Sequence, residues 1–180
     1  MARINAVEVI EDFLPEKTLK HLESIIESNT FNWFFQRSTA FENQIEGINQ
    51  YMFTHVLYHP KNTVGSVFLN DFDIVPITLA NKYNFKETFR MKLNLYPYQN
   101  EKVHHTPHYD MTDENDHTKS VPGFTSAVLN FTTCNGGTVI GNQDFISKRN
   151  QLLLFPSNVK HHGYTATDVQ ARIVLNVILK

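Results

Sequence analysis

This sequence of 180 residues has only one cysteine, no long apolar run and no marked excess of charge of either sign. The single cysteine, Cys134, has no partner for an internal disulfide, so a reducing compartment is expected. No apolar stretch approaches the length needed to cross a membrane, and the polar opening MARINAVEVIEDF does not resemble a signal peptide. We therefore expect a cytoplasmic protein without a membrane partner.

The charges are nearly balanced, with 16 Lys and Arg against 18 Asp and Glu and a pI near 6.5. A dedicated nucleic-acid-binding protein carries a basic surface, so the composition argues against one without excluding a nucleotide as substrate. No internal repeat and no low-complexity segment is present. A chain of this length with 41% hydrophobic residues fits one globular domain with a substantial core.

The first 88 residues are expected to support the rest of the domain. Ala6–Phe13 is short and mostly apolar, which predicts a strand, and a weak helical pattern covers Asp71–Tyr83. The aromatic-rich stretch Thr30–Pro60 has no clean period; it fits either core or the lining of a substrate site, and core is favoured. A helix is predicted over Glu16–Ser28, where the apolar residues at helical spacing are Leu19, Leu22, Ile25 and Ile26.

From residue 89 onward, short strands separated by Gly, Pro and Asn turns predominate. Apolar and polar residues alternate from Arg90 to Tyr98, which predicts a strand that Pro97 interrupts. The polar stretch Met111–Gly123 is typical of a surface loop and could act as a lid. Further strands are predicted at Phe124–Thr132, Thr138–Ile140, Gln151–Phe155 and Ala171–Leu179. This series predicts a mainly β protein, a jelly roll or barrel, with its helices confined to the N-terminal part.

Candidate metal ligands follow the strand of residues 90–98. On an extended segment His108 and Asp110 point to the same side and could hold one metal ion together. With nine histidines and 18 acidic residues, such a pair is expected about once by chance, so the pair alone decides little. Further along, His161 and His162 are adjacent, and on an extended chain only one of them can face inward.

Arg172 follows His161 by eleven residues and shares one face of the last predicted strand with Asn176. Burying an unpaired guanidinium is costly, so a buried Arg172 would imply an anionic partner, for which a carboxylate has suitable geometry. An exposed arginine at a strand end is the alternative. Two histidines and one carboxylate on a metal are typical of non-haem Fe(II) oxygenases. Zinc hydrolases accept the same ligands but give the arginine no role.

Together these segments resemble the 2-oxoglutarate- and Fe(II)-dependent dioxygenases, and most closely the prolyl-4-hydroxylase-like branch and the small forms found in bacteriophages. The likeness covers roughly Phe89 to the C-terminus and, more weakly, the opening strand and helix. The residues that carry it, in the order in which the family has them, are Asn94-Leu95-Tyr96-Pro97, His108-Tyr109-Asp110, Gly136-Gly137-Thr138, Phe155-Pro156, His161-His162-Gly163 and Arg172-Ile173-Val174-Leu175-Asn176.

The resemblance implies a double-stranded β-helix, which is a cupin-like jelly roll. Residues 1–180 would form a single 2-oxoglutarate/Fe(II) oxygenase domain, with 1–88 as an N-terminal supporting segment and 89–180 as the β-helix core. His108, Asp110 and His161 would be the catalytic iron ligands. His161 is favoured over His162 because the second histidine of the family often stands two residues before a glycine.

The resemblance also implies a cosubstrate site. Arg172 would bind the distal carboxylate of 2-oxoglutarate, and Tyr96 would donate a hydrogen bond to the same molecule. Asn94 and Asn176 would line this site, although polar groups satisfied inside a barrel would look the same in the sequence.

The implied reaction consumes 2-oxoglutarate and O2, with ascorbate as an optional reductant, and releases succinate and CO2 while a substrate C–H bond is hydroxylated. The presence of Asp110 favours hydroxylation over halogenation, for which the family replaces this carboxylate by a small residue. A prolyl or other protein or peptide side chain is the first expectation for the substrate, and a free amino acid or a nucleobase stays open. If the source is a bacteriophage, the compartment would be the host cytoplasm.

Two other functions fit the same residues. One is a metal-binding cupin-type protein without oxygenase activity, and the other is a zinc-dependent hydrolase without 2-oxoglutarate turnover. A pure interaction module would leave the ordered set of metal-ligand residues without a purpose.

Overall fold

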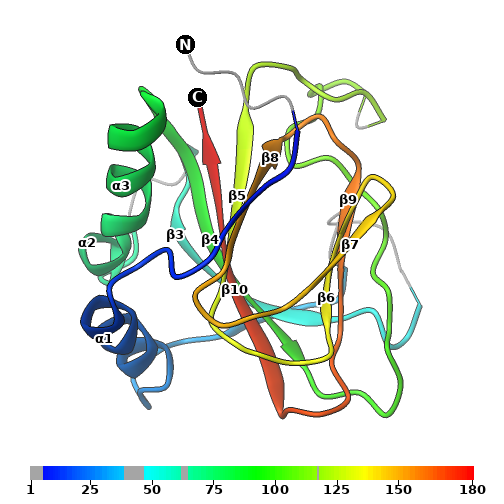
Figure 1. The fold of residues 1–180 in the computed structure, drawn as a ribbon. Helices are drawn as coiled ribbons and strands as arrows, with labels where there is room; N and C mark the ends of the chain where they lie inside the picture. The colour runs from blue at the N-terminus through cyan, green and yellow to red at the C-terminus, as the bar shows by residue number, and fades with distance from the viewer. Residues whose placement is uncertain (1–5, 39–46, 62–64, 117) are drawn as a thin grey trace.

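Two facing antiparallel sheets form the protein in the computed structural model, which describes residues 6–38, 47–61, 65–116 and 118–180 (Figure 1). The large sheet has the strand order β1-β8-β5-β10-β4-β3-β2, and the small sheet has the order β7-β6-β9. The large sheet comprises β1 (Glu8–Ile10), β2 (Phe34–Gln36), β3 (Met52–Tyr58), β4 (Thr88–Pro97), β5 (Thr125–Asn130), β8 (Leu152–Pro156) and β10 (Ala171–Leu179). The small sheet comprises β6 (Gly137–Ile140), β7 (Gln143–Ile146) and β9 (His161–Tyr164). This mainly β architecture confirms the predicted fold class.

Among the described residues, three helices cover the outer face of the large sheet, away from the small sheet (Figure 1). They are α1 (Glu16–Ile26), α2 (Leu69–Phe72) and α3 (Ile74–Tyr83). The apolar stripe of α1 buries Leu19 and Leu22 in one cluster with Leu93 of β4 and Leu175 of β10, and all four are inaccessible to solvent. Within the described ranges, no helix has the length and apolar character that a membrane span requires.

A second apolar cluster fills part of the space between the two sheets. It contains Tyr96 of β4, Val174 of β10 and Phe155 of β8 from the large sheet, together with Ile140 of β6 from the small sheet. Alternate side chains of β4 therefore pack on opposite faces of the large sheet: Leu93 packs against the helices, and Tyr96 faces the small sheet. The strand ends at Pro97, as its sequence predicts.

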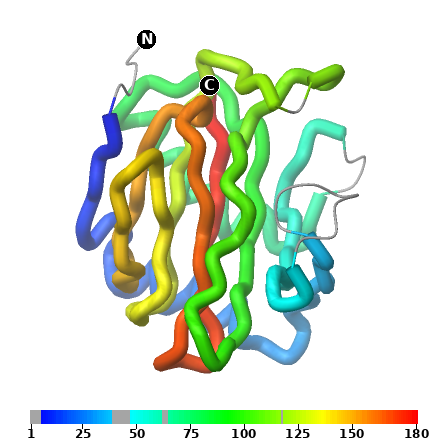
Figure 2. The backbone as a smooth tube through the Cα atoms, turned by 90° about the vertical axis from the view of Figure 1, so that its right-hand side faces the viewer, coloured from blue at the N-terminus to red at the C-terminus, as the bar shows by residue number. Residues whose placement is uncertain are grey.

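The connection from β4 to β5 extends the small sheet before it returns to the large one. Residues 103–108 run antiparallel to β9, with backbone hydrogen bonds from His105 N to Gly163 O and from Thr165 N to Val103 O. Figure 2 shows this connection in green beside the orange β9. It lacks the regular pattern of a full strand, but it brings His108 directly opposite His161.

Several predicted boundaries differ from the structure. The strand predicted over Ala6–Phe13 is limited to β1, and the strands β7 and β9 were not predicted. Thr30–Pro60 contains β2 and β3; Phe34 and Phe35 are 56% and 54% exposed, so the prediction of core is wrong for these two residues. They lie on β2, the last strand of the large sheet, which pairs only with β3 among the described strands. Residues 39–46 of that segment and residue 117 of the predicted lid lie outside the described residues.

Candidate active site

His108 and His161 meet because their backbones are paired across two neighbouring segments. Each donates its backbone N–H to the carbonyl of the other at 2.9 Å. Residues paired in this way in antiparallel segments carry their side chains on the same face. The two imidazole centroids are accordingly 4.7 Å apart. A single pair of backbone hydrogen bonds thus brings together two histidines that are 53 positions apart in the sequence.

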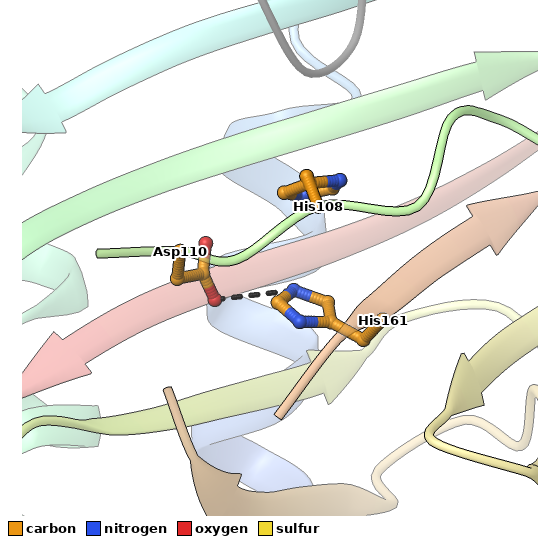
Figure 3. A group of neighbouring side chains, drawn as sticks. All are labelled: His108, Asp110 and His161. Atoms are coloured by element: carbon orange, nitrogen blue, oxygen red, sulfur yellow. Dashed lines mark ion pairs between the residues drawn. The ribbon is translucent and has the colours of Figure 1, made fainter. Parts of the chain in front are cut away.

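Asp110 completes the predicted group of three. One nitrogen of each histidine and one Asp110 oxygen all lie within 4.8 Å of one another. The closest approach is from His161 Nε2 to Asp110 Oδ2 at 3.3 Å, drawn as the dashed line in Figure 3. Tyr109, between the two ligand candidates, is turned away from them, and its ring lies 6.0 Å from the ammonium of exposed Lys160.

Both histidines are oriented by the same local hydrogen bond. His108 Nδ1 lies 3.0 Å from the carbonyl oxygen of Thr106, and His161 Nδ1 lies 3.0 Å from that of Val159. A carbonyl oxygen can only accept, so Nδ1 must carry the proton in both rings. In the neutral ring, Nε2 then has its lone pair free, which is the arrangement seen in metal-ligating histidines.

The charge states also suit a metal centre. Burial, with repulsion from His161, lowers the pKa of His108 to about 4, so this ring is neutral near pH 7. Burial alone would raise the pKa of Asp110, but His161 and Arg90 hold it well below its ordinary value. Burial likewise opposes protonation of His161, yet its contact with Asp110 raises its pKa. Without metal, Asp110 and His161 thus form an ion pair, and a divalent cation would take the place of the proton.

Three side chains orient the Asp110 carboxylate. Arg90 Nη2 donates to Oδ1 at 2.6 Å, Ser126 Oγ donates to Oδ2 at 2.6 Å, and Asn176 Nδ2 donates to Oδ2 at 3.2 Å. Arg90 also donates to Asn176 Oδ1 at 3.0 Å, which ties the two donors together. The side chain of Asp110 is only 4% exposed. Asn176 therefore touches the metal-ligand candidate, four residues along β10 from Arg172.

Arg172 is buried, with 1% of its surface exposed, and it faces no carboxylate among the described residues. One guanidinium nitrogen, Nη2, donates to Thr138 Oγ1 at 2.8 Å and to Asn130 Oδ1 at 3.2 Å. The other two, Nε and Nη1, are buried and have no hydrogen-bond partner among the described residues. A buried charge in this state is costly, so two donors are available for an anion that these residues do not themselves provide.

Tyr96 lies directly opposite Arg172 in the β4–β10 register, and its ring centroid is 5.2 Å from the guanidinium carbon. Burial raises the pKa of Tyr96, so its hydroxyl stays protonated and can donate a hydrogen bond. Gly163 of β9 makes room for this ring, because a Cβ there would lie 2.8 Å from the Tyr96 hydroxyl oxygen. Asn94, two residues before Tyr96, is also buried, and its Oδ1 has no partner among the described residues.

His162 points away from the candidate site. Its Nε2 lies 3.1 Å from Nδ1 of exposed His104. This placement agrees with the expectation that only one of the adjacent histidines faces inward, and the inward one is His161.

The sequence interpretation missed Arg90, Lys92 and Ser126, which also lie on the inner face of the large sheet. The alternation along β4 could have identified Arg90 and Lys92 as inner-face residues, since they continue the polar series of Asn94 and Tyr96. A polar residue in the apolar strand Thr125–Asn130 is the corresponding signal for Ser126.

No protein-family model and no curated protein matches the sequence. Solved structures do match the fold. A prolyl-4-hydroxylase from Pseudomonas putida is 14% identical, with a TM-score of 0.64, and the match covers 98% of this chain and 93% of that one. The fold is that of the 2-oxoglutarate oxygenases. A Trichoplax adhaerens prolyl hydroxylase, in complex with a peptide fragment of the hypoxia inducible factor oxygen degradation domain, is 10% identical with a TM-score of 0.69, covering 97% of this chain and 83% of its own.

HygX from Streptomyces hygroscopicus, with nickel, 2-oxoglutarate and hygromycin B bound, is 8% identical with a TM-score of 0.62, and the match covers 98% of this chain and 83% of HygX. These similarities confirm the predicted resemblance to prolyl-4-hydroxylase-like oxygenases at the level of the fold. The phage branch is not among the three. At such low sequence identity the shared fold does not determine the reaction, which must be argued from the site residues of this chain.

Proposed function

We propose that this protein is a 2-oxoglutarate- and Fe(II)-dependent dioxygenase that hydroxylates a substrate C–H bond and releases succinate and CO2. The proposal depends on one observation above the others. Two donor nitrogens of buried Arg172, Nε and Nη1, have no hydrogen-bond partner among the described residues, and Arg172 lies on the same face of β10 as Asn176, which contacts the metal-ligand candidate Asp110. A zinc hydrolase or a simple cupin-type metal binder has no use for a buried guanidinium in this position.

The distance along β10 between Arg172 and Asn176, which contacts Asp110, suits the length of 2-oxoglutarate. Four residues of strand separate Arg172 from Asn176, roughly 13 Å between Cα atoms. An arginine side chain and a five-carbon diacid together can span such a gap. Arg172 would hold the distal carboxylate with Nε and Nη1, and the Tyr96 hydroxyl would donate to the same molecule. Asn94 would line the site beside Tyr96.

His108, Asp110 and His161 are proposed as the metal ligands, with the two Nε2 atoms and one carboxylate oxygen as donors. This set fits Fe(II), for which a facial group of two histidines and one carboxylate is the usual arrangement with positions left open. Bound Fe(II) would supply the activation of O2 that couples cosubstrate decarboxylation to hydroxylation. Arg90, Ser126 and Asn176 would fix the orientation of the carboxylate, so that one oxygen is presented to the metal.

The substrate is proposed to be a protein or peptide side chain, such as a prolyl residue, or a small molecule. The first choice is supported by the peptide bound to the Trichoplax adhaerens neighbour and the second by hygromycin B on HygX. No dedicated nucleic-acid binding and no membrane partner is proposed.

The proposed function is tested by incubating the Fe(II)-loaded protein with 2-oxoglutarate and measuring succinate. We expect turnover that requires both the metal and the cosubstrate, and ascorbate is included to keep iron reduced. Arg172→Ala should weaken 2-oxoglutarate binding at least tenfold while leaving Mn(II) binding, measured by electron paramagnetic resonance, within a factor of two. Absence of both turnover and cosubstrate binding would favour the hydrolase or the cupin-type protein instead.

A further inference from the structure

Lys92 lies on the inner face of β4, between the metal-ligand candidates and the edge of the large sheet. Its cross-strand neighbours are Asn176 of β10 on one side and Val56 of β3 on the other. Residues directly opposed in antiparallel strands have Cβ atoms about 5 Å apart. Asn176 itself bonds the Asp110 carboxylate at 3.2 Å. The Lys92 side chain therefore starts beside a residue that touches the candidate metal centre.

No side chain in the described ranges forms a hydrogen bond or an ion pair with the Lys92 ammonium. Its nearest cationic neighbour along the strand, Arg90, is already bonded to Asp110 and Asn176. Burial is the main cause that lowers the pKa of Lys92, to about 8; Arg90 adds to the effect and Asp110 opposes it. Because this pKa stays above 7, the side chain is predominantly charged at neutral pH.

Under the proposed function, the other charges on the inner face each have a partner. Arg90 is bonded to Asp110, which it would share with the metal, and Arg172 would bind the distal carboxylate of the cosubstrate. Lys92 is then the cation without a counter-ion among the described residues of the site. A partly buried ammonium is stabilised by an anion that reaches it, so an anionic ligand group fits this position.

Lys92 is half-buried, and the residues around it are more exposed to solvent than Arg172 is. Arg172, at the proposed cosubstrate end, is 1% exposed, whereas Val56 beside Lys92 is 37% exposed and the Arg90 side chain is 23% exposed. A molecule that arrives from solvent would thus meet Lys92 before it meets Arg172. A single ammonium balances the single charge of a carboxylate, whereas a phosphate group of higher charge would keep part of its charge uncompensated in this half-buried position.

We propose that Lys92 binds a carboxylate of the substrate, and that the natural substrate is therefore a carboxylic acid held with its acid group at β4 and a C–H bond beside His108, Asp110 and His161. This inference rests on the proposed oxygenase function and adds the chemical class of the substrate. The acid group could belong to a small molecule or to an acidic residue of a peptide. Both sources share the same contact, an ammonium to a carboxylate.

The test compares matched acids and amides. Protein loaded with Mn(II) and 2-oxoglutarate, which does not turn over, is titrated calorimetrically with N-acetyl amino acids and with their carboxamides. A second arm uses short peptides that contain aspartate and the same peptides with asparagine. The variant Lys92→Met removes the charge with little change in volume, and Lys86→Met is the control, because Lys86 is an exposed lysine in the short segment between α3 and β4.

We expect at least one acid to bind roughly tenfold or more tightly than its amide to the native protein and to Lys86→Met, and this preference to disappear in Lys92→Met. Lys92→Arg should restore part of it. The arm in which the preference occurs identifies a small or a peptide substrate. No preference for any acid, including no binding at all, or a preference that survives in Lys92→Met, overturns the assignment. Binding of 2-oxoglutarate is measured first on the same samples: its absence overturns the proposed function and this inference together, whereas its presence without an acid preference overturns the Lys92 assignment alone.

Discussion

Arg90 donates a hydrogen bond from Nη2 to Oδ1 of Asp110 at 2.6 Å, so a cation is bonded directly to the carboxylate proposed to hold a metal cation. The arginine and the metal would share one anionic group. Arg90 must therefore matter most when the metal is absent, because Arg90 and His161 then supply the positive charges in direct contact with the buried carboxylate.

We predict that Arg90→Met destabilises the metal-free protein by about 2 kcal/mol and the metal-loaded protein by clearly less. Urea unfolding with a chelator and with excess Mn(II) measures both values. Arg149→Met is the matched control, since Arg149 pairs with Glu16 and Glu23 of α1, far from the site. It should lower both stabilities equally. Equal effects from Arg90→Met would contradict the shared-carboxylate interpretation.

The pH dependence of the metal-free protein should report on His108. Its folded-state pKa of about 4 lies below its ordinary value of about 6.5, so the neutral ring contributes stability above pH 6.5. That contribution is lost as the pH falls from 6.5 towards 4, by up to about 1.4 kcal/mol per pH unit. Urea midpoints between pH 4 and 7.5 in the presence of a chelator measure the slope. His108→Gln should flatten this part of the curve, and an unchanged slope would show that other groups cause it.

Ser126 is predicted to matter for metal affinity more than for folding. It is fully buried and donates to Asp110 Oδ2 at 2.6 Å, with Ser157 Oγ 2.9 Å away. Ser126→Ala removes one of the hydrogen bonds that orient the carboxylate, and we expect Mn(II) affinity to fall roughly tenfold. Ser147→Ala is the control, because Ser147 is equally buried but bonds Asn130 and Thr132. A similar loss of affinity in both variants would count against a specific role for Ser126.

Gly163 is predicted to protect the cosubstrate site. A Cβ at this position would lie 2.8 Å from the Tyr96 hydroxyl oxygen and 3.0 Å from its ring carbon, and the ring is packed beneath Arg172. Gly163→Ala should displace the ring, cost about 1–3 kcal/mol of stability and weaken 2-oxoglutarate binding more than Mn(II) binding. Gly65→Ala serves as the control, since its nearest contact would be an ordinary 3.6 Å. Unchanged cosubstrate affinity in Gly163→Ala would argue against the placement of Tyr96.

The sequence predicts those parts of the site that depend on local periodicity. The alternation along β4 places Asn94 and Tyr96 on the inner face, and the same rule puts Arg172 and Asn176 together on β10. The family resemblance selects His108, Asp110 and His161, which the structure brings together.

What the sequence does not predict depends on pairing between distant segments. Residues 103–108 have no strand pattern, yet they pair with β9, and that register alone brings His108 to His161. The exposure of Phe34 and Phe35 follows from the position of β2 at the sheet edge, which no local pattern encodes. The contact between Arg90 and Asp110 also requires the β4–β5 connection to fold back over the strand from which it departs.

The two backbone hydrogen bonds between His108 and His161 join the proposed chemistry to the mechanics of the fold. An ion held by both imidazoles would add a link between the long β4–β5 connection and the small sheet, and its loss would remove that link while the main-chain hydrogen bonds and the contact between His161 and Asp110 remain. The amide protons of His108 and His161 should therefore exchange with solvent more slowly in the metal-loaded protein. Their exchange rates would then report whether the metal is bound, without any substrate being needed.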